Sequence, residues 1–347
     1  MPRLRRADPT CAGILRTRQG RGFRYTWSRS GDRVDDPETI GRIEALVIPP
    51  AWKDVWICAW PNGHIQAVGT DAAGRRQYLY HEEWRRRRDE QKYARALEFG
   101  SVLPQVREKV TADLDGDGLT DRRVLAAAVR LLDIGCFRIG SESYARDNET
   151  YGIATLRKDH LRFNRGRMVF CYPAKGSITR TLEVRDPHVE RVLLPLRRRR
   201  GGSDQLLAYK ARGRWTDLHS ADVNSYLKEV AGPDFSAKDF RTWSGTVFMA
   251  VQLALVEPVP KSAKGRRRAV TAAVREAAEY LGNTPAVCRS SYIDPRVIDH
   301  FEEGTTIAAH GWTARDSRDS WDVEAVRAAA ERALLAMLSD TEGLAAA

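Results

Sequence analysis

The sequence predicts an α+β protein in two parts, a small β-rich domain over residues 1–90 and a larger, mainly α-helical domain over residues 91–347 that contains a small three-stranded sheet. Most of the first eighty residues form short alternating stretches separated by turn residues, as strands do. From Glu82 the pattern becomes helical and highly charged, except over residues 161–184, where short strands return. The chain of 347 residues is long enough for two domains.

Strands are expected at four places in the first domain. One is FRYTWS, two flank an Asn62-Gly63 turn in VWICAWPNGHIQAVGTD, and the fourth is RRQYLYH. Alternation in the fourth stretch puts Tyr78 and Tyr80 on one face of the strand and Leu79 on the other.

One helix is expected in the first domain, over DDPETIGRIEALVIPP. Asp36 can cap its N-terminus. Ile40, Ile43 and Val47 then share one face before Pro49 ends the helix.

The second domain opens with helical patterns, among them RRVLAAAVRLLDIG, which Asp121 can cap and Gly135 can end. Residues 161–184 are expected to form three short strands with tight turns at 164–166 and 174–177. This arrangement places Lys175 at the tip of a hairpin.

After Val184, helical patterns continue to the end of the chain, and VPKSAKGRRRAV between two of them is expected to be a mobile loop. Five apolar residues then form one stripe of a helix that Gly282 can terminate: Val270, Val274, Ala277, Ala278 and Leu281. Thr284 and Pro285 can begin a short further helix that carries Tyr292 near its end.

The composition indicates an extended polyanion as the partner. There are 57 Lys and Arg residues, 47 of them Arg, against 46 acids, which gives a net charge of +11. The guanidinium group binds phosphate in a bidentate manner, so nucleic acid is the first candidate. The alternative is a solvated basic surface.

Several classes of protein are disfavoured. The five cysteines form no CxxC pair, which argues against a disulfide framework and a zinc finger. DLDGDGLTD imitates a calcium loop, but Val124 stands where a bidentate Glu is needed, and GTDAAGRR lacks the Lys-Ser/Thr ending of a phosphate-binding loop. No metal and no cofactor are therefore expected. Because no apolar run is long enough for a membrane span or a signal peptide, we expect a cytoplasmic protein, associated with the nucleoid.

Two arginines stand beside structured, apolar sequence. Arg138 follows a helix stop, and Arg241 lies between Phe240 and Trp243, where an isolated charge is costly. Taken singly, each is better explained as a structural arginine paired with a local acid. Taken with Lys175 and Tyr292, they suggest one chemistry, in which a tyrosine oxygen attacks a phosphodiester, two guanidiniums hold the non-bridging oxygens and a lysine supplies a proton to the leaving oxygen.

The chain resembles the bacterial and poxvirus-type DNA topoisomerases IB. The resemblance covers nearly the whole chain, from VIPPAWKDVWI through QYLYH, FRIGSESYARDNETYGIATL, YPAKG and KDFRTWSGT to LGNTPAVCRSSYIDP. It implies the fold of tyrosine recombinases and type IB topoisomerases, with a β-rich N-terminal domain and a helical catalytic domain that close as a clamp around duplex DNA. It further implies ATP-independent and metal-independent relaxation of supercoils by a monomer, through a 3′-phosphotyrosyl intermediate, strand rotation and religation.

The resemblance also assigns residues. The two catalytic arginines fall on Arg138 and Arg241, the general acid on Lys175 and the nucleophile on Tyr292. The fifth position, which is histidine in the poxvirus enzymes, falls on Asn283. An amide N–H can still donate to a non-bridging oxygen, but it carries no charge. DNA contacts fall on Gln77, Tyr78 and Tyr80 in the first domain and on Tyr144 and Asn148 in the second.

Two other functions fit part of the pattern. A tyrosine site-specific recombinase shares the chemistry, but recombinases usually carry His-x-x-Arg at the second arginine, where this chain has Lys238-Asp239-Phe240-Arg241. A non-catalytic architectural DNA-binding protein accounts for the charge and for Tyr78 and Tyr80, but not for the five assigned site residues.

Overall fold

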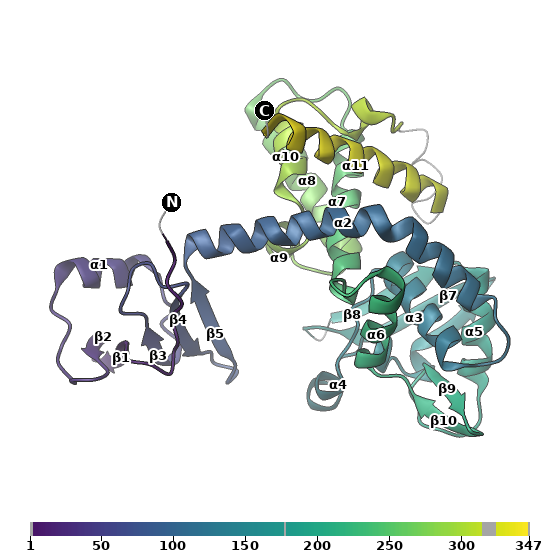
Figure 1. Ribbon diagram of the computed structural model, residues 1–347, viewed down its shortest axis with the longest axis horizontal. Helices are drawn as coiled ribbons and strands as arrows, with labels where there is room; N and C mark the ends of the chain where they lie inside the picture. Colours follow the sequence, from purple (N-terminus) through teal and green to yellow (C-terminus); the bar gives the residue numbers. More distant parts are fainter. Residues whose placement is uncertain (1–2, 177, 314–323, 346–347) are drawn as a thin grey trace. The chain divides into compact units, whose positions relative to one another are not determined.

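The computed structural model describes residues 3–176, 178–313 and 324–345. It confirms the α+β class, with two compact units, Met1–Lys92 and Tyr93–Ala347 (Figure 1). Helix α2 (Glu82–Leu114) begins in the first unit and ends in the second. In the described parts of the chain, no helix is long and apolar enough to cross a membrane.

The first unit is built on an antiparallel sheet with strand order β2-β1-β3-β4-β5. Its elements are β1 (Ile14–Gln19), β2 (Gly22–Trp27), α1 (Pro37–Ala45), β3 (Lys53–Ile57), β4 (Ile65–Thr70) and β5 (Arg76–Tyr80). Ile14, Ile43, Val55 and Ile57 form part of the core between the sheet and α1. Strand β1 was not predicted, because the buried Arg16 interrupts its apolar pattern; this side chain donates to the carbonyls of Ile48, Pro49 and Trp52.

The prediction for Val47 was wrong. Helix α1 ends at Ala45, and Val47 has φ +47° and an exposed fraction of 80%, whereas Ile43 is buried. Pro49 restricts the residue before it to extended backbone, so the chain leaves the helix before reaching the proline.

The second unit holds the remaining elements. They are α3 (Asp121–Gly135), α4 (Glu142–Asn148), η1 (Ile153–Thr155), η2 (Lys158–His160), β6 (Leu161–Asn164), β7 (Arg167–Ala174), β8 (Ile178–Val184), α5 (Pro187–Arg198), β9 (Ala208–Ala211), β10 (Arg214–Asp217), α6 (Ser220–Ala231), α7 (Ala237–Ala254), α8 (Ala263–Leu281), α9 (Pro285–Ser291), α10 (Pro295–Glu302), η3 (Ile307–His310) and α11 (Glu324–Ala345). Helix α3 packs against α5, α6 and α7, and α7 packs in turn against α8, α10 and α11. The predicted three-stranded sheet is present, with order β6-β7-β8 and antiparallel pairing.

Three local predictions in this unit need correction. The N-cap of α3 is Thr120, which accepts from the Arg123 N–H, while Asp121 already occupies the first helical position. The expected mobile loop is largely helical, because Ser262 caps α8 by accepting from the Gly265 N–H and is followed by good helix formers. Strands β9 and β10 form a hairpin in a stretch expected to be helical; its turn contains two residues with positive φ, Arg212 and Gly213.

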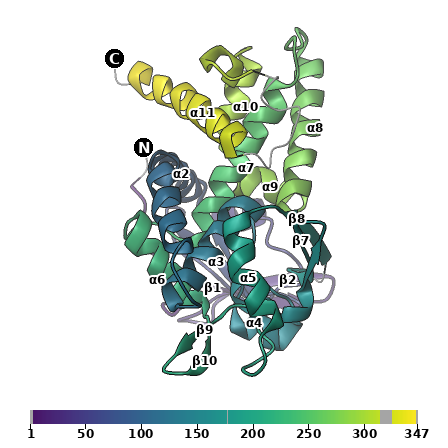
Figure 2. The ribbon, with the colours of Figure 1, turned by 90° about the vertical axis from the view of Figure 1, so that its right-hand side faces the viewer.

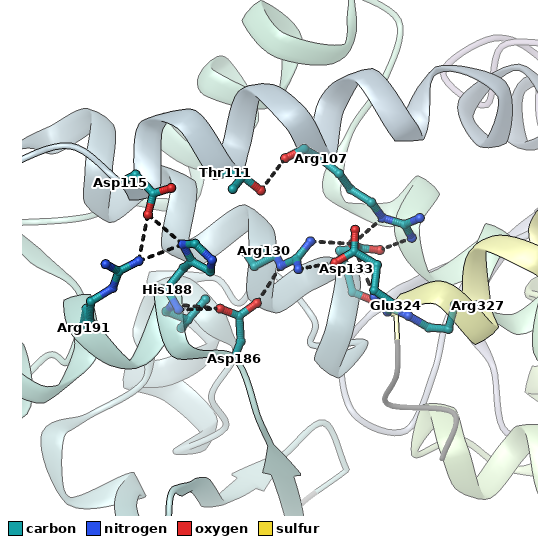
Figure 3. A network of polar contacts seen from close by, with 11 residues as sticks. Arg107, Thr111, Asp115, Arg130, Asp133, Asp186, His188, Arg191, Glu324 and Arg327 are labelled. Carbon is teal, nitrogen blue, oxygen red and sulfur yellow. Dashed lines mark hydrogen bonds and ion pairs between the residues drawn. The ribbon is translucent and has the colours of Figure 1, made fainter. Parts of the chain in front are cut away.

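A buried ionic network ties the last helix to the centre of the second unit (Figure 3). Arg107 of α2 donates to both carboxylate oxygens of Asp133 in α3, at 2.8 and 2.9 Å, and to both of Glu331 in α11, at 2.7 and 2.8 Å. Arg327 of α11 donates to the main-chain carbonyl of Asp133 at 3.2 Å. Arg130 adds ion pairs with Asp186 and Glu324.

Asp133→Asn is expected to lower the free energy of unfolding by about 3–5 kcal/mol, because it removes the buried negative charge that faces the guanidiniums of Arg107, Arg130 and Arg327. Burial alone would raise the pKa of Asp133, but the charges of Arg107 and Arg327 and the hydrogen bonds from Arg107 hold it well below its usual range. The contribution of the carboxylate is therefore complete above pH 3.8, the ordinary value, and is lost as the pH falls below it. Urea unfolding at pH 7 and at pH 3 checks both expectations.

The matched control is Glu183→Gln, which removes a charge from an exposed ion pair with Arg167. It should change stability by at most about 0.5 kcal/mol. An Asp133→Asn effect as small as that of the control would contradict the structural role of the network.

Candidate active site

Tyr292 lies at the C-terminal end of α9. Thr284 caps this helix by accepting from the Val287 N–H, and Pro285 occupies its first turn, as predicted. The Tyr292 N–H donates to the Cys288 carbonyl at 3.0 Å, and its own carbonyl accepts from the Thr246 hydroxyl of α7 at 3.2 Å. The backbone of the tyrosine is thus held without use of its phenolic oxygen.

Arg241 lies beside this tyrosine, in the interior of α7. Its side chain is buried, and its guanidinium carbon lies 5.0 Å from the centroid of the Tyr292 ring. It donates to the carbonyl of Cys136 and, at 2.8 Å, to that of Leu281. Burial alone would raise the pKa of Tyr292, but the charge and hydrogen bond of Arg241, with the charges of Arg138 and Lys238, lower it overall.

Arg138 and Asn283 follow the ends of two different helices. Arg138 comes after α3, whose C-cap Cys136 has left-handed backbone, and Asn283 comes after α8, whose C-cap is Gly282 with φ +60°. The Arg138 guanidinium donates to the side-chain oxygen of Asn283. The Asn283 side-chain N–H₂ is buried and has no partner in the part of the chain that the structure describes.

The positive charge in this cluster is not balanced by acids. Within the described residues, Arg138, Arg180 and Arg241 donate to carbonyl oxygens and form no ion pair with a carboxylate. Burial and the neighbouring charges of Arg241 and Arg180 lower the pKa of Arg138 to about 10. Arg241 is buried and the other two arginines are half-buried. Like charges held together in this way without an acid indicate a site for an anion, and guanidinium groups suit a phosphate.

Arg180 was missed in the sequence. It lies on β8, opposite Tyr172 of β7. With Leu182 and Val184 it occupies the less exposed positions of that strand. A charged residue at an alternate position on the apolar side of a strand is the signal that could have found it.

Lys175 is not part of this buried cluster. It lies in the turn between β7 and β8, its side chain is exposed, and it forms no hydrogen bond or ion pair within the described residues. Gly176 follows it with φ +82°. The structure thus brings Arg138, Arg241, Asn283 and Tyr292 together and leaves Lys175 at the hairpin tip.

The backbone around Arg138 is held by a close approach of two glycines. The Arg138 and Ile139 carbonyls accept from the N–H groups of Ile153 and Ala154, each at 2.8 Å. A Cβ atom added at Gly152 would lie 2.4 Å from the Gly140 nitrogen and 2.5 Å from the Arg138 oxygen. Only glycine fits at position 152 without displacing Arg138.

The expected DNA contacts of the first unit lie on β5. Tyr78 and Tyr80 stack with ring centroids 6.0 Å apart, and both rings are exposed. Gln77 points to the other face of the strand and donates to the Asp71 carboxylate at 2.9 Å. In the second unit, Tyr144 and Asn148 are four residues apart on α4, and both are exposed.

Residues 81–310 match the family model described as eukaryotic DNA topoisomerase I, catalytic core, and residues 22–71 match that of the bacterial DNA topoisomerase IB N-terminal domain. The chain is 30% identical over 289 residues to DNA topoisomerase 1B of Acanthamoeba polyphaga mimivirus, covering 81% of this chain and 85% of that protein. It is 20% identical over 275 residues to DNA topoisomerase 1B of Vaccinia virus (strain Copenhagen), covering 76% and 82%. A solved structure of the XerH site-specific recombinase bound to its difH substrate is similar with a TM-score of 0.34 and 15% identity, over 60% of this chain and 53% of that one.

Proposed function

We propose that this chain, which belongs to the family of type IB DNA topoisomerases, relaxes supercoiled duplex DNA by cutting and resealing one strand. Tyr292 is half-buried among guanidinium groups, and within the described residues no carboxylate neutralises them. The proposal depends on this observation. A phosphodiester supplies the missing negative charge.

In the proposed reaction, the phenolic oxygen of Tyr292 loses its proton and attacks the phosphorus of one strand. The bond from phosphorus to the 5′ oxygen breaks, and Lys175 donates a proton to that oxygen. The products are a 3′-phosphotyrosyl bond and a free 5′-hydroxyl. One phosphoester bond replaces another, so the 5′-hydroxyl can reverse the step after the free end has rotated.

Arg138, Arg241 and Asn283 are proposed to stabilise the negative charge that grows on the non-bridging oxygens. The lowered pKa of Tyr292 favours the attacking phenolate, since the same guanidiniums stabilise that anion. The unpartnered N–H₂ of Asn283 supplies an uncharged donor where a histidine would be expected.

Duplex DNA is the proposed partner of both units. Tyr78 and Tyr80 present stacked aromatic rings, and Tyr144 and Asn148 present polar groups on an exposed helix. Gln77 would have to leave Asp71 to reach DNA. One monomer is expected to suffice, because relaxation needs a single cleaved strand.

The test is relaxation of supercoiled plasmid in EDTA without nucleotide. Both positive and negative supercoils should be removed, because arginine and lysine side chains supply the positive charge and the phosphotyrosyl bond conserves the bond energy. Tyr292→Phe protein serves as the blank. A strict requirement for Mg²⁺ or ATP would overturn the proposal.

Gly152→Ala is expected to slow DNA cleavage by a factor on the order of 100, because the new methyl group must displace the Arg138 carbonyl and with it the guanidinium. Single-turnover cleavage of a labelled duplex measures this rate. Gly41→Ala is the control, since a Cβ there meets nothing within 4 Å. If both variants cleave at the unaltered rate, the glycine contact does not position Arg138.

A further inference from the structure

Arg180 joins the hairpin of Lys175 to the ends of two helices. One terminal nitrogen of its guanidinium donates to the Leu281 carbonyl at 2.6 Å. The other donates to the Tyr280 carbonyl at 3.0 Å and to the Gly135 carbonyl at 3.5 Å. Figure 2 shows β7 and β8 beside the end of α8, in agreement with the bonds to Leu281 and Tyr280.

These carbonyls belong to the last residues of α3 and α8. Carbonyl groups at a helix C-terminus lack a partner within the helix and carry partial negative charge, so a guanidinium is stabilising there. Arg138 follows one of these ends and Asn283 follows the other. Arg241 also donates to the Leu281 carbonyl, at 2.8 Å, so the two arginines hold the same point of the chain.

The fit around Arg180 is close. Gly282 has φ +60°, and a Cβ there would lie 2.6 Å from a terminal nitrogen of Arg180. Both terminal nitrogens of Arg180 are engaged by main-chain carbonyls. The terminal nitrogens of Arg241 are engaged in the same way, but its Nε–H is buried beside Tyr292 and donates to no main-chain carbonyl among the described residues. We therefore take Arg241 to contact substrate and Arg180 to act through other residues.

Lys175 precedes Arg180 by five residues on the same hairpin and lies in the turn that follows the Ala174–Ile178 pair. On the other strand, the Pro173 carbonyl accepts from the Tyr151 N–H at 2.8 Å. The side chain of Arg180 ties β8 to the segments carrying Arg138 and Asn283. The hairpin is thus held on both strands, through the Pro173 backbone on β7 and through the Arg180 side chain on β8.

We propose that Arg180 is a positioning residue for strand cleavage, which sets the Lys175 hairpin against the segments of Arg138 and Asn283. The inference rests on the proposed function. It adds a residue outside the five assigned from the sequence, and it makes Lys175 the group through which that residue acts.

The test is a double-mutant cycle on the single-turnover cleavage rate of a labelled duplex, with Arg180→Met, Lys175→Ala and the pair. Arg180→Met should slow cleavage by about 10- to 100-fold in the otherwise unchanged protein. In the Lys175→Ala protein, adding Arg180→Met should lower the cleavage rate by no more than about 2-fold, because the hairpin no longer carries the lysine that Arg180 positions. If the cleavage rate of the double variant falls by the product of the two single losses, the proposal is overturned.

Arg199→Met is the matched control. Arg199 is buried, whereas Arg180 is half-buried, and Arg199 likewise donates to main-chain carbonyls, those of Leu196, Leu206 and Ser203, away from the site. Its effect on thermal unfolding should resemble that of Arg180→Met, while cleavage changes by no more than about 2-fold. If Arg180→Met and Arg199→Met lower the cleavage rate equally, Arg180 has only a structural role.

Two other experimental results also have a defined meaning. If Arg180→Met does not fold, Arg180→Lys, which keeps the charge and can satisfy one carbonyl, takes its place in the cycle with a smaller expected loss. If the unaltered protein forms no denaturation-resistant adduct with DNA, the proposed function itself fails. That outcome is distinct from an active protein whose two losses multiply.

Discussion

Tyr292→Phe is expected to abolish the covalent protein–DNA adduct while leaving non-covalent DNA binding nearly unchanged. The substitution removes one oxygen, which is the proposed nucleophile, so the cleavage rate should fall by about 10⁴-fold or more. The ring can keep its place beside Arg241. The backbone bonds to Cys288 and Thr246 do not use the hydroxyl.

A denaturing gel with a labelled duplex detects the adduct, and a mobility-shift titration measures binding. Tyr209→Phe removes the same oxygen from a half-buried tyrosine on β9 and should still form the adduct. A denaturation-resistant complex with Tyr292→Phe would show that the nucleophile lies elsewhere.

Lys175→Ala is expected to slow cleavage of ordinary DNA by roughly 10²- to 10⁴-fold, the range of general acid catalysis. The 5′ oxygen of deoxyribose is a poor leaving group because its alcohol has a high pKa, and a proton delivered as the bond breaks removes that difficulty. Lys175 is exposed at the tip of the β7–β8 hairpin, where its amino group is free to meet DNA.

A substrate in which sulfur replaces the scissile 5′ bridging oxygen separates two roles for this lysine. A thiolate leaves readily without a proton, so Lys175→Ala should regain most of its rate on the sulfur substrate. Arg241→Ala should not, because its proposed contact is to non-bridging oxygens. Equal loss for Lys175→Ala on both substrates would leave the lysine an electrostatic role only.

The local structure around the site could be predicted because it depends on neighbours in sequence. Thr284 and Pro285 begin α9, Gly282 ends α8, and the turn between β7 and β8 holds Lys175. Capping, positive φ and strand alternation each involve a few adjacent residues. The family was identified from the same short segments.

The local rules failed where a distant group decided the outcome. Arg16 interrupts the pattern of β1, yet it is buried because carbonyls more than thirty residues away accept its donors. The hairpin of β9 and β10 differs from the prediction for a local reason, because its turn residues, Arg212 and Gly213, do not form a common turn signal.

The family, the α+β division and the residues expected to react all follow from the sequence. Which partners the buried and half-buried arginines have follows only from the tertiary structure. Arg180 meets carbonyls 101 and 100 positions further along the chain, and Arg107 meets Glu331 across 224 positions. A buried charge is stable only with such partners. The partners gain as well, because a helix-end carbonyl or a buried carboxylate without a donor is itself costly.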